Sequence, residues 1–300
     1  MDRTQYKCCR RGANLRRKRR RHRKIQRSVI FSCSIIAVAV FVIVGSRMIR
    51  SGDGRANKYD VEAGNDTYDN ADIENTKISE KNKIQNNQSM LDDIMNSTQY
   101  PKQLQELALK NEEALEFVYD YPTEHVKEHI VDLTEEASMD SVPLFVQWDK
   151  RWGYEKYSGN FFAASGCGPT TLSMVVVYLT HNRDASPLAV AKYSKEAGYS
   201  VDGSGSSWTL ISEGCRHYGV KAKTVSLDES RMKAELDAGH PIVVNVGPGD
   251  FTDTGHFMVI TGYDDEGFSI NDPNSIEKSG KRWLFKNISS QIRAVWSMYV

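Results

Sequence analysis

Residues 165–179 read SGCGPTTLSMVVVYL, and this stretch carries the strongest single signal for the fold. A proline followed by a long apolar run suits the first turn of a buried helix, where the missing proline N–H has no intrahelical acceptor. We therefore expect a helix that opens at Cys167. The free backbone N–H groups at such an end favour a thiolate over a thiol, and the flanking glycines allow a close approach by substrate or backbone. A buried structural cysteine is the alternative interpretation.

Residues 254–263, TGHFMVITGY, predict a strand with a histidine at its first residue. The run is short, rich in β-branched residues and bounded by glycines. His256 at the mouth of a strand can reach a neighbouring helix end and activate a nucleophile as a base. Taken alone, His256 is better explained as a capping or surface histidine.

Residues 267–275, GFSINDPNS, predict a second strand, paired with the first through a turn at residues 264–267. This hairpin would bring Asp272 near the start of the neighbouring strand. Its carboxylate could then accept a hydrogen bond from His256 and stabilise the imidazolium. Asn271 could serve in its place, and turn formation alone would also explain the Asn-Asp-Pro-Asn sequence.

Gln147 lies upstream, in the segment VQWDKRWG of residues 146–153. Its amide could join the backbone N–H of Cys167 in holding an oxyanion. Gln147, Gly166-Cys167-Gly168-Pro169-Thr170, Gly255-His256-Phe257-Met258-Val259 and Asn271-Asp272-Pro273, in this order, resemble the papain-like bacteriocin-processing peptidases. Those enzymes trim double-glycine leader peptides and have many stand-alone relatives in Gram-positive bacteria. The resemblance covers roughly residues 140–300, and it implies a Cys-His-Asp triad in a cleft between a helical half and a sheet half.

The rest of the chain fits an α+β fold, because helices come first and strands later. We predict helices over 187–197, 206–219 and 228–238, strands over 242–246, 257–263 and 268–271, and an edge strand over 295–300. The glycine-containing segments 203–208 and 247–250 lack the Lys-Ser/Thr ending of a nucleotide-binding loop, so we expect turns there. No Cys/His spacing fits zinc, and we predict neither a metal nor a cofactor. Cys215 is expected to be a reduced, buried helix residue.

The first fifty residues predict a membrane anchor. Residues 28–46 hold no charge and would span about 28 Å as a helix, close to the thickness of a bilayer core. A buried globular helix and a cleaved signal peptide are the rival interpretations. Residues 1–27 carry 13 Lys/Arg and one acidic residue, which places them in the cytoplasm, although such a block can also contact nucleic acid. The remainder, with 26 basic and 38 acidic residues, would then lie outside the cell.

The chain is therefore predicted to comprise five parts. These are a cytoplasmic basic tail (1–27), a transmembrane helix (28–47), a disordered polar linker (48–98), a helical brace or stalk (99–138) and a papain-like peptidase domain (139–300). In the brace, apolar residues from Leu104 to Val118 fit one amphipathic helix that ends at Tyr121-Pro122. A structural brace is favoured over a regulatory prosegment.

Composition excludes two broad classes and leaves three functions open. An apolar fraction of 40% with 10% aromatics excludes wholesale disorder, and five cysteines in 300 residues do not make a disulfide scaffold. We predict a membrane-anchored extracellular cysteine peptidase that acts on a peptide or protein through an acyl-enzyme, without nucleic acid as a partner. The alternatives are a cell-wall peptide amidase or transpeptidase with the same triad, and a non-catalytic peptide-binding module.

Overall fold

The computed structural model describes residues 69–300. The predicted cytoplasmic tail, the transmembrane segment 28–47 and the linker as far as residue 68 lie outside the described residues. Within 69–300, none of the helices combines the length and the apolar character that crossing a membrane requires.

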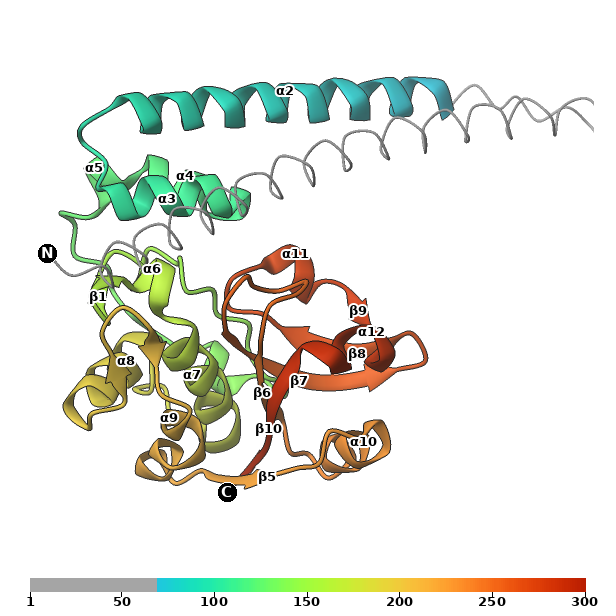
Figure 1. Cartoon of the computed structure of the whole chain (residues 1–300). Helices are drawn as coiled ribbons and strands as arrows, with labels where there is room; N and C mark the ends of the chain where they lie inside the picture. Colours follow the sequence, from blue (N-terminus) through green and yellow to red (C-terminus); the bar gives the residue numbers. More distant parts are fainter. Residues whose placement is uncertain (1–68) are drawn as a thin grey trace, which may run out of the picture. The chain divides into compact units, whose positions relative to one another are not determined.

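A long helix, α2 (Asp69–Asn96), stands where the sequence predicted a disordered linker (Figure 1). The prediction rested on the polar composition and on the missing apolar period. The segment contains neither proline nor glycine, however, so nothing in it interrupts a helix. Met90 and Ile94 near its end are buried in a cluster with Leu104 and Val118. This tertiary packing stabilises the helix although its sequence has no apolar period.

The brace is a series of short helices instead of the one predicted. They are α3 (Lys102–Lys110), the 3-10 turn η1 (Glu112–Ala114), α4 (Leu115–Tyr119), α5 (Tyr121–Glu124) and η2 (Glu136–Ser138). The break falls at Asn111, whose backbone is extended and whose side chain accepts a hydrogen bond from the N–H of Glu113 at 3.0 Å. Such local capping competes with helix continuation. The predicted apolar residues Leu104, Leu107 and Val118 are nevertheless buried.

The next part of the chain is mainly helical. Its elements are β1 (Lys156–Tyr157), β2 (Asn160–Phe161), α6 (Phe162–Ser165), α7 (Cys167–Thr180), α8 (Pro187–Glu196), β3 (Ser200–Val201), β4 (Gly205–Ser206), α9 (Thr209–Ser212) and η3 (Gly214–Tyr218). The predicted helix over 187–197 is confirmed as α8, with Ser186 as its N-cap. The one predicted over 206–219 is split into α9 and η3.

An antiparallel sheet of six strands forms the other part, in the order β5-β10-β6-β7-β8-β9. The elements are β5 (Lys221–Thr224), α10 (Glu229–Asp237), β6 (Ile242–Val246), β7 (His256–Asp264), β8 (Gly267–Asn271), α11 (Ile276–Ser279), β9 (Arg282–Trp283), α12 (Phe285–Ile288), η4 (Ser289–Gln291) and β10 (Ile292–Tyr299). The last strand was predicted at an edge, which is wrong: β10 pairs with both β5 and β6. β5 was missed because its sequence, KAKT, has no apolar alternation.

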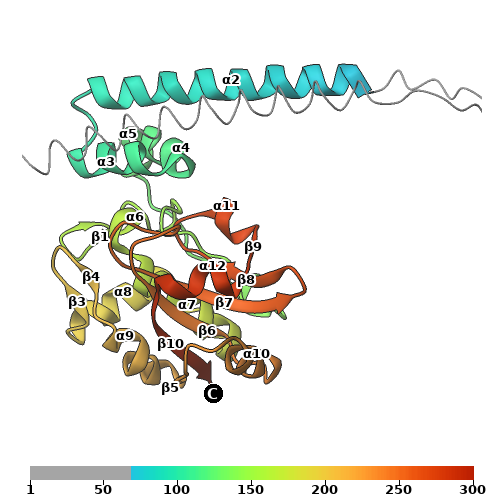
Figure 2. The same cartoon turned by 45° about the vertical axis from the view of Figure 1, so that its right-hand side comes forward.

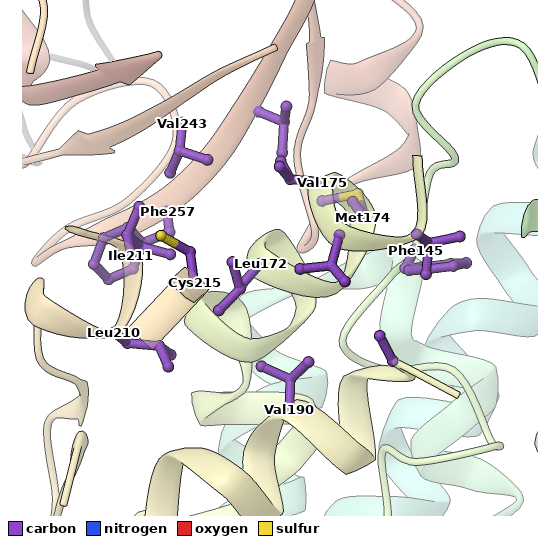
Figure 3. Close-up of a cluster of buried hydrophobic side chains, with 14 of the residues drawn as sticks. Phe145, Leu172, Met174, Val175, Val190, Leu210, Ile211, Cys215, Val243 and Phe257 are labelled. Atoms are coloured by element: carbon purple, nitrogen blue, oxygen red, sulfur yellow. The ribbon is translucent and has the colours of Figure 1, made fainter. Parts of the chain in front are cut away.

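One cluster of buried hydrophobic side chains surrounds α7. In Figures 1 and 2 this helix lies between the sheet and the helices α8 and α9. Figure 3 shows Leu172 and Val175 of α7 among Val190 of α8, Leu210 of α9 and Val243 of β6. Ten of its fourteen residues, from Gly168 to Val177, are buried. Helix packing against a sheet therefore fixes the position of its first residue, Cys167, relative to the strands.

Candidate active site

Cys167 is the first residue of α7, as the sequence predicted, and the residue is half-buried. The two adjacent glycines fill places where a side chain would not fit. A Cβ on Gly166 would come within 2.5 Å of the Phe162 ring, and one on Gly168 within 2.5 Å of the Ser206 hydroxyl oxygen. Phe162 is fully buried and cannot withdraw. The first turn of α7 is thus packed tightly around Cys167, and Cys167 also lines a groove.

The β7–β8 hairpin brings His256 and Asp272 together. Its register pairs Val259 with Asn271, so Asp272, directly after β8, lies beside the first residues of β7. His256 Nε2 and Asp272 Oδ1 are 2.6 Å apart, with the Asp272 side chain fully buried and the His256 side chain only 7% exposed. The predicted pair is therefore in contact.

Asn271, the alternative partner for the histidine, is engaged elsewhere. Its Nδ2 donates to the carbonyl oxygens of Val142 at 3.0 Å and Pro143 at 3.1 Å. These bonds tie the end of β8 to the segment that precedes Gln147. The residue that contacts His256 is therefore Asp272.

Cys167 and His256 line the same pocket, because α7 packs against β7 at this point, and each side chain shifts the pKa of the other. The Thr171 hydroxyl, one helical turn after Cys167, donates to the carbonyl oxygen of Phe257 at 3.1 Å. Since Nε2 of His256 faces Asp272, the other ring nitrogen, Nδ1, is the one left for the sulfur. The three side chains named from the sequence thus form one contiguous cluster.

The electrostatics of the cluster favour a charged pair. Burial by itself would lower the pKa of His256, but the adjacent Asp272 carboxylate outweighs it, and the pKa of His256 is raised well above 6.5. Burial by itself would raise the pKa of Cys167, yet the hydrogen bond and the charge of His256 outweigh it and hold that pKa below 9.0. The N–H groups of Phe257 and Gly168 act in the same direction. Both shifts favour a thiolate beside an imidazolium.

Gln147 lines the same groove as Cys167 and His256. Its side chain is 5% exposed, and its Nε2 donates one hydrogen bond to the carbonyl oxygen of Ala163 at 2.7 Å. An amide nitrogen carries two hydrogens, so one remains for a further acceptor. The backbone N–H of Gln147 donates to the Pro273 carbonyl at 2.7 Å, which links this residue to the Asp272 turn.

Two buried side-chain oxygens in the described part of the chain lack a hydrogen-bond partner there, and both belong to this cluster. They are Oε1 of Gln147 and Oδ2 of Asp272. Unpaired buried polar atoms oppose folding and are rare away from functional sites. Their concentration around Cys167 marks this region as one shaped by function as well as by stability.

Two adjoining pockets, of about 570 and 690 Å³, extend the groove on either side of Cys167. The first pocket contains Gln147 and His256, and α3 contributes Gln103, Glu106 and Lys110 to it. The second is lined by the segments 203–206 and 246–248 and by the exposed ring of Trp208. The sequence predicted the glycine segments as turns but did not place α3 at the groove. The spacing of Gln103, Glu106 and Lys110 on one helical face was the available signal.

Other polar clusters in residues 69–300 do not add to this site. No group of three or more His, Cys, Asp and Glu side chains in this range is arranged to hold a metal ion. Cys215 is free and buried in η3, and burial raises the pKa of its thiol to about 11. This matches the predicted reduced and buried residue, and it leaves Cys167 as the reactive thiol of the pair.

Comparisons with known proteins point to one family. A family model described as the "Peptidase_C39 like family" matches residues 139–300. Among solved structures, the chain is similar to the peptidase domain of Streptococcus ComA, a bi-functional ABC transporter involved in a quorum-sensing pathway (20% identity, TM-score 0.39, 53% of this chain and 96% of that one). It is also similar to a protein described as a C39-like peptidase from Bacillus anthracis (17% identity, TM-score 0.33, 53% and 95%). No curated protein matches the chain.

Proposed function

The chain belongs to the peptidase C39-like family, and from this premise we propose that it is a membrane-anchored extracellular cysteine peptidase. Cys167 is the nucleophile, His256 the acid and base, and Asp272 the group that orients His256. The observation that carries the proposal is the 2.6 Å contact between His256 and Asp272 beside a partly exposed Cys167 at a helix N-terminus.

The reaction follows from the charged resting pair. The Cys167 thiolate attacks the peptide carbonyl carbon, and a C–S bond forms as the carbonyl oxygen becomes an oxyanion. The oxyanion accepts hydrogen bonds from Gln147 Nε2 and the backbone N–H of Cys167. His256 then gives its proton to the leaving amine, the C–N bond breaks, and a thioester remains. Water, deprotonated by neutral His256, releases the acid and restores the thiolate and imidazolium.

The position of His256 indicates which half of the groove binds each side of the cleaved bond. The leaving amine must reach the imidazolium to be protonated, and His256 lines only the pocket that α3 borders. Residues of the substrate on the carboxyl side of the cleaved bond therefore lie in the pocket with Gln103, Glu106 and Lys110. Residues on the amino side lie along Trp208 and the segments 203–206 and 246–248.

The proposal also includes the location of the chain in the membrane and the side on which its peptidase part lies. Residues 28–46 supply an uncharged stretch long enough to span a bilayer, and the basic block before it favours a cytoplasmic N-terminus. The peptidase part then faces outward. Protease added to intact cells should degrade residues 69–300 and spare an epitope placed in residues 1–27. Protection of residues 69–300 under the same conditions would contradict the outward orientation.

A peptide-library profile of the full-length chain tests the activity. Wild-type protein should cleave a subset of peptides, and Cys167→Ala should cleave none of them. Products that carry an added amine would assign the site to acyl transfer instead of hydrolysis. Absence of both cleavage and labelling of Cys167 by a thiol-reactive probe would overturn the proposal in favour of a binding module.

The pH dependence of kcat/KM should be bell-shaped, because the active form needs a thiolate and an imidazolium together. The thiolate forms as pH rises through the lowered pKa of Cys167, so the rising limb lies below 9.0. The imidazolium is lost as pH rises through the raised pKa of His256, so the falling limb lies above 6.5. Steady-state rates across pH 4–11 check this. A single rising limb at an ordinary thiol pKa would contradict it.

Gln147→Ala should lower kcat by about 100-fold with little change in KM, since it removes one donor to the oxyanion and little ground-state contact. Gln147→Glu is the matched comparison. It keeps the size of the side chain but puts a carboxylate opposite the oxyanion and the Ala163 carbonyl, so kcat should fall further. Rates equal to wild type in Gln147→Ala would remove this residue from the proposed mechanism.

A further inference from the structure

The segment between α3 and α4 contacts the turn that carries Asp272, although it lies outside the family-matched residues 139–300. Two side chains make these contacts, Asn111 and Glu113. They are separated by about 160 residues from the turn at 272–277, which we call the acid turn. Neither was singled out from the sequence, because only the tertiary fold brings them to this place.

Asn111 is bonded to the acid turn through its amide. Its Nδ2 donates to the backbone carbonyl of Asn274 at 2.9 Å and to Oδ1 of Asn274 at 3.1 Å. Its own oxygen is held by the N–H of Glu113. The Asn111 residue is only 9% exposed, so these bonds form with little competition from water.

Glu113 holds the other end of the same turn. One carboxylate oxygen accepts from the Ser275 hydroxyl, and the other accepts from the backbone N–H groups of Ile276 at 2.7 Å and Glu277 at 3.1 Å. Hydrogen bonds to a charged acceptor are stronger than neutral ones. A single side chain thus satisfies three donors of the acid turn.

The acid turn transmits this restraint to the catalytic pair. The N–H of Asn274 donates to Asp272 Oδ1 at 2.8 Å, and this is the oxygen that bonds His256 Nε2. Oδ2 of Asp272 is buried without a partner among the described residues, so the carboxylate is held through Oδ1 alone. The position of Asn274 therefore decides where Oδ1 points.

We propose that Asn111 and Glu113 are positioning residues, which hold the acid turn so that Asp272 keeps its contact with His256. The brace is then a part of the catalytic unit and not only a stalk. This inference rests on the proposed function and deepens it. If the acid turn loosens, Asp272 Oδ1 moves away from His256, and the imidazolium loses the charge that favours it.

Other charged groups face the same pocket and must be kept constant in a test. Glu106 and Lys110 reach it from α3, Asp250 and Asp253 from the β6–β7 loop, and Lys278 from α11. The substitutions chosen here leave all five unchanged, together with Cys167, His256 and Asp272. A shift in the pH profile can therefore be traced to the geometry of the acid turn.

The test compares Asn111→Ala and Glu113→Gln with Glu112→Gln in the full-length chain. Glu112 is on the same short helix, but its carboxylate accepts from Asn87 of α2. Both test variants should lower kcat about tenfold with little change in KM, as expected for weakening of one buried hydrogen-bonded contact. The falling limb of the pH profile should move to lower pH. Glu112→Gln should match wild type in each quantity.

Alkylation of Cys167 by iodoacetamide gives a readout that does not depend on peptide cleavage. Its rate below pH 7 should fall in Asn111→Ala and Glu113→Gln, because fewer molecules hold the thiolate–imidazolium pair. Unchanged pH profiles and alkylation rates in both variants would overturn the proposal, even if one variant lost stability. Normal alkylation of wild type without peptide cleavage would instead contradict the proposed function alone.

Discussion

Cys167→Ala should abolish peptide cleavage, with a loss of kcat/KM on the order of 10⁴-fold or more. The variant removes the sulfur that forms the covalent intermediate, and losses of this size are usual when a nucleophile is deleted. The fold should persist, because Cys167 is only half-buried and alanine is a good residue in a first helical turn. Cleavage rates check the loss of activity, and circular dichroism spectra of the same samples check that the fold persists.

Cys215→Ala is the matched control for this result. Cys215 is a buried, free thiol, and its raised pKa of about 11 makes it a poor nucleophile. The variant should keep its catalytic rate and lose some stability from the small cavity left in the core. If Cys167→Ala retained cleavage and Cys215→Ala lost it, the assignment of the nucleophile would be wrong.

His256→Ala should also lower kcat/KM on the order of 10⁴-fold, and the double variant with Cys167→Ala should lose no more than either single variant. The two side chains act as a unit: without the imidazole, the thiol is protonated at neutral pH and the leaving amine has no proton donor. Additive losses in the double variant would show that the two residues act independently, against the mechanism.

The same substitution should destabilise the fold, unlike Cys167→Ala. It leaves the fully buried Asp272 carboxylate without its imidazolium partner, and loss of one member of a buried charged pair costs about 3 kcal/mol or more in comparable cases. Urea unfolding of the two variants measures the difference. Equal stabilities would mean that the His256–Asp272 contact contributes little to the native state. Activities of the variants are compared under conditions in which His256→Ala is folded.

Local sequence patterns were enough to place Cys167, His256 and Asp272 at the ends of their helix and strands. The apolar run after Cys167 predicts α7, and the glycine-bounded strand predicts His256 at the start of β7. The short turn at 264–267 then fixes the hairpin that brings Asp272 to His256. Each of these inferences needs only periodicity and turn length, because the interacting strands are consecutive.

Features that depend on distant contacts were missed. The position of β10 depends on β5, whose polar sequence KAKT becomes a strand only when it pairs with β10. α2 is held by burial of Met90 and Ile94 against the brace. The sequence pattern placed Asn111 inside one continuous helix of the brace, and its bonds to Asn274 require the whole domain to fold. Sequence patterns record local preference and not the partner that satisfies it.

The most direct test of the charged pair is the pH dependence of Cys167 alkylation by iodoacetamide, followed by mass spectrometry of the Cys167 peptide. In wild type the rate should rise through a pKa below 9.0, and His256→Ala should move that rise to higher pH. The Cys215 peptide in the same digest should stay unlabelled below pH 9, as its pKa of about 11 requires. An ordinary thiol pKa for Cys167 in wild type that stays unchanged in His256→Ala would contradict the account.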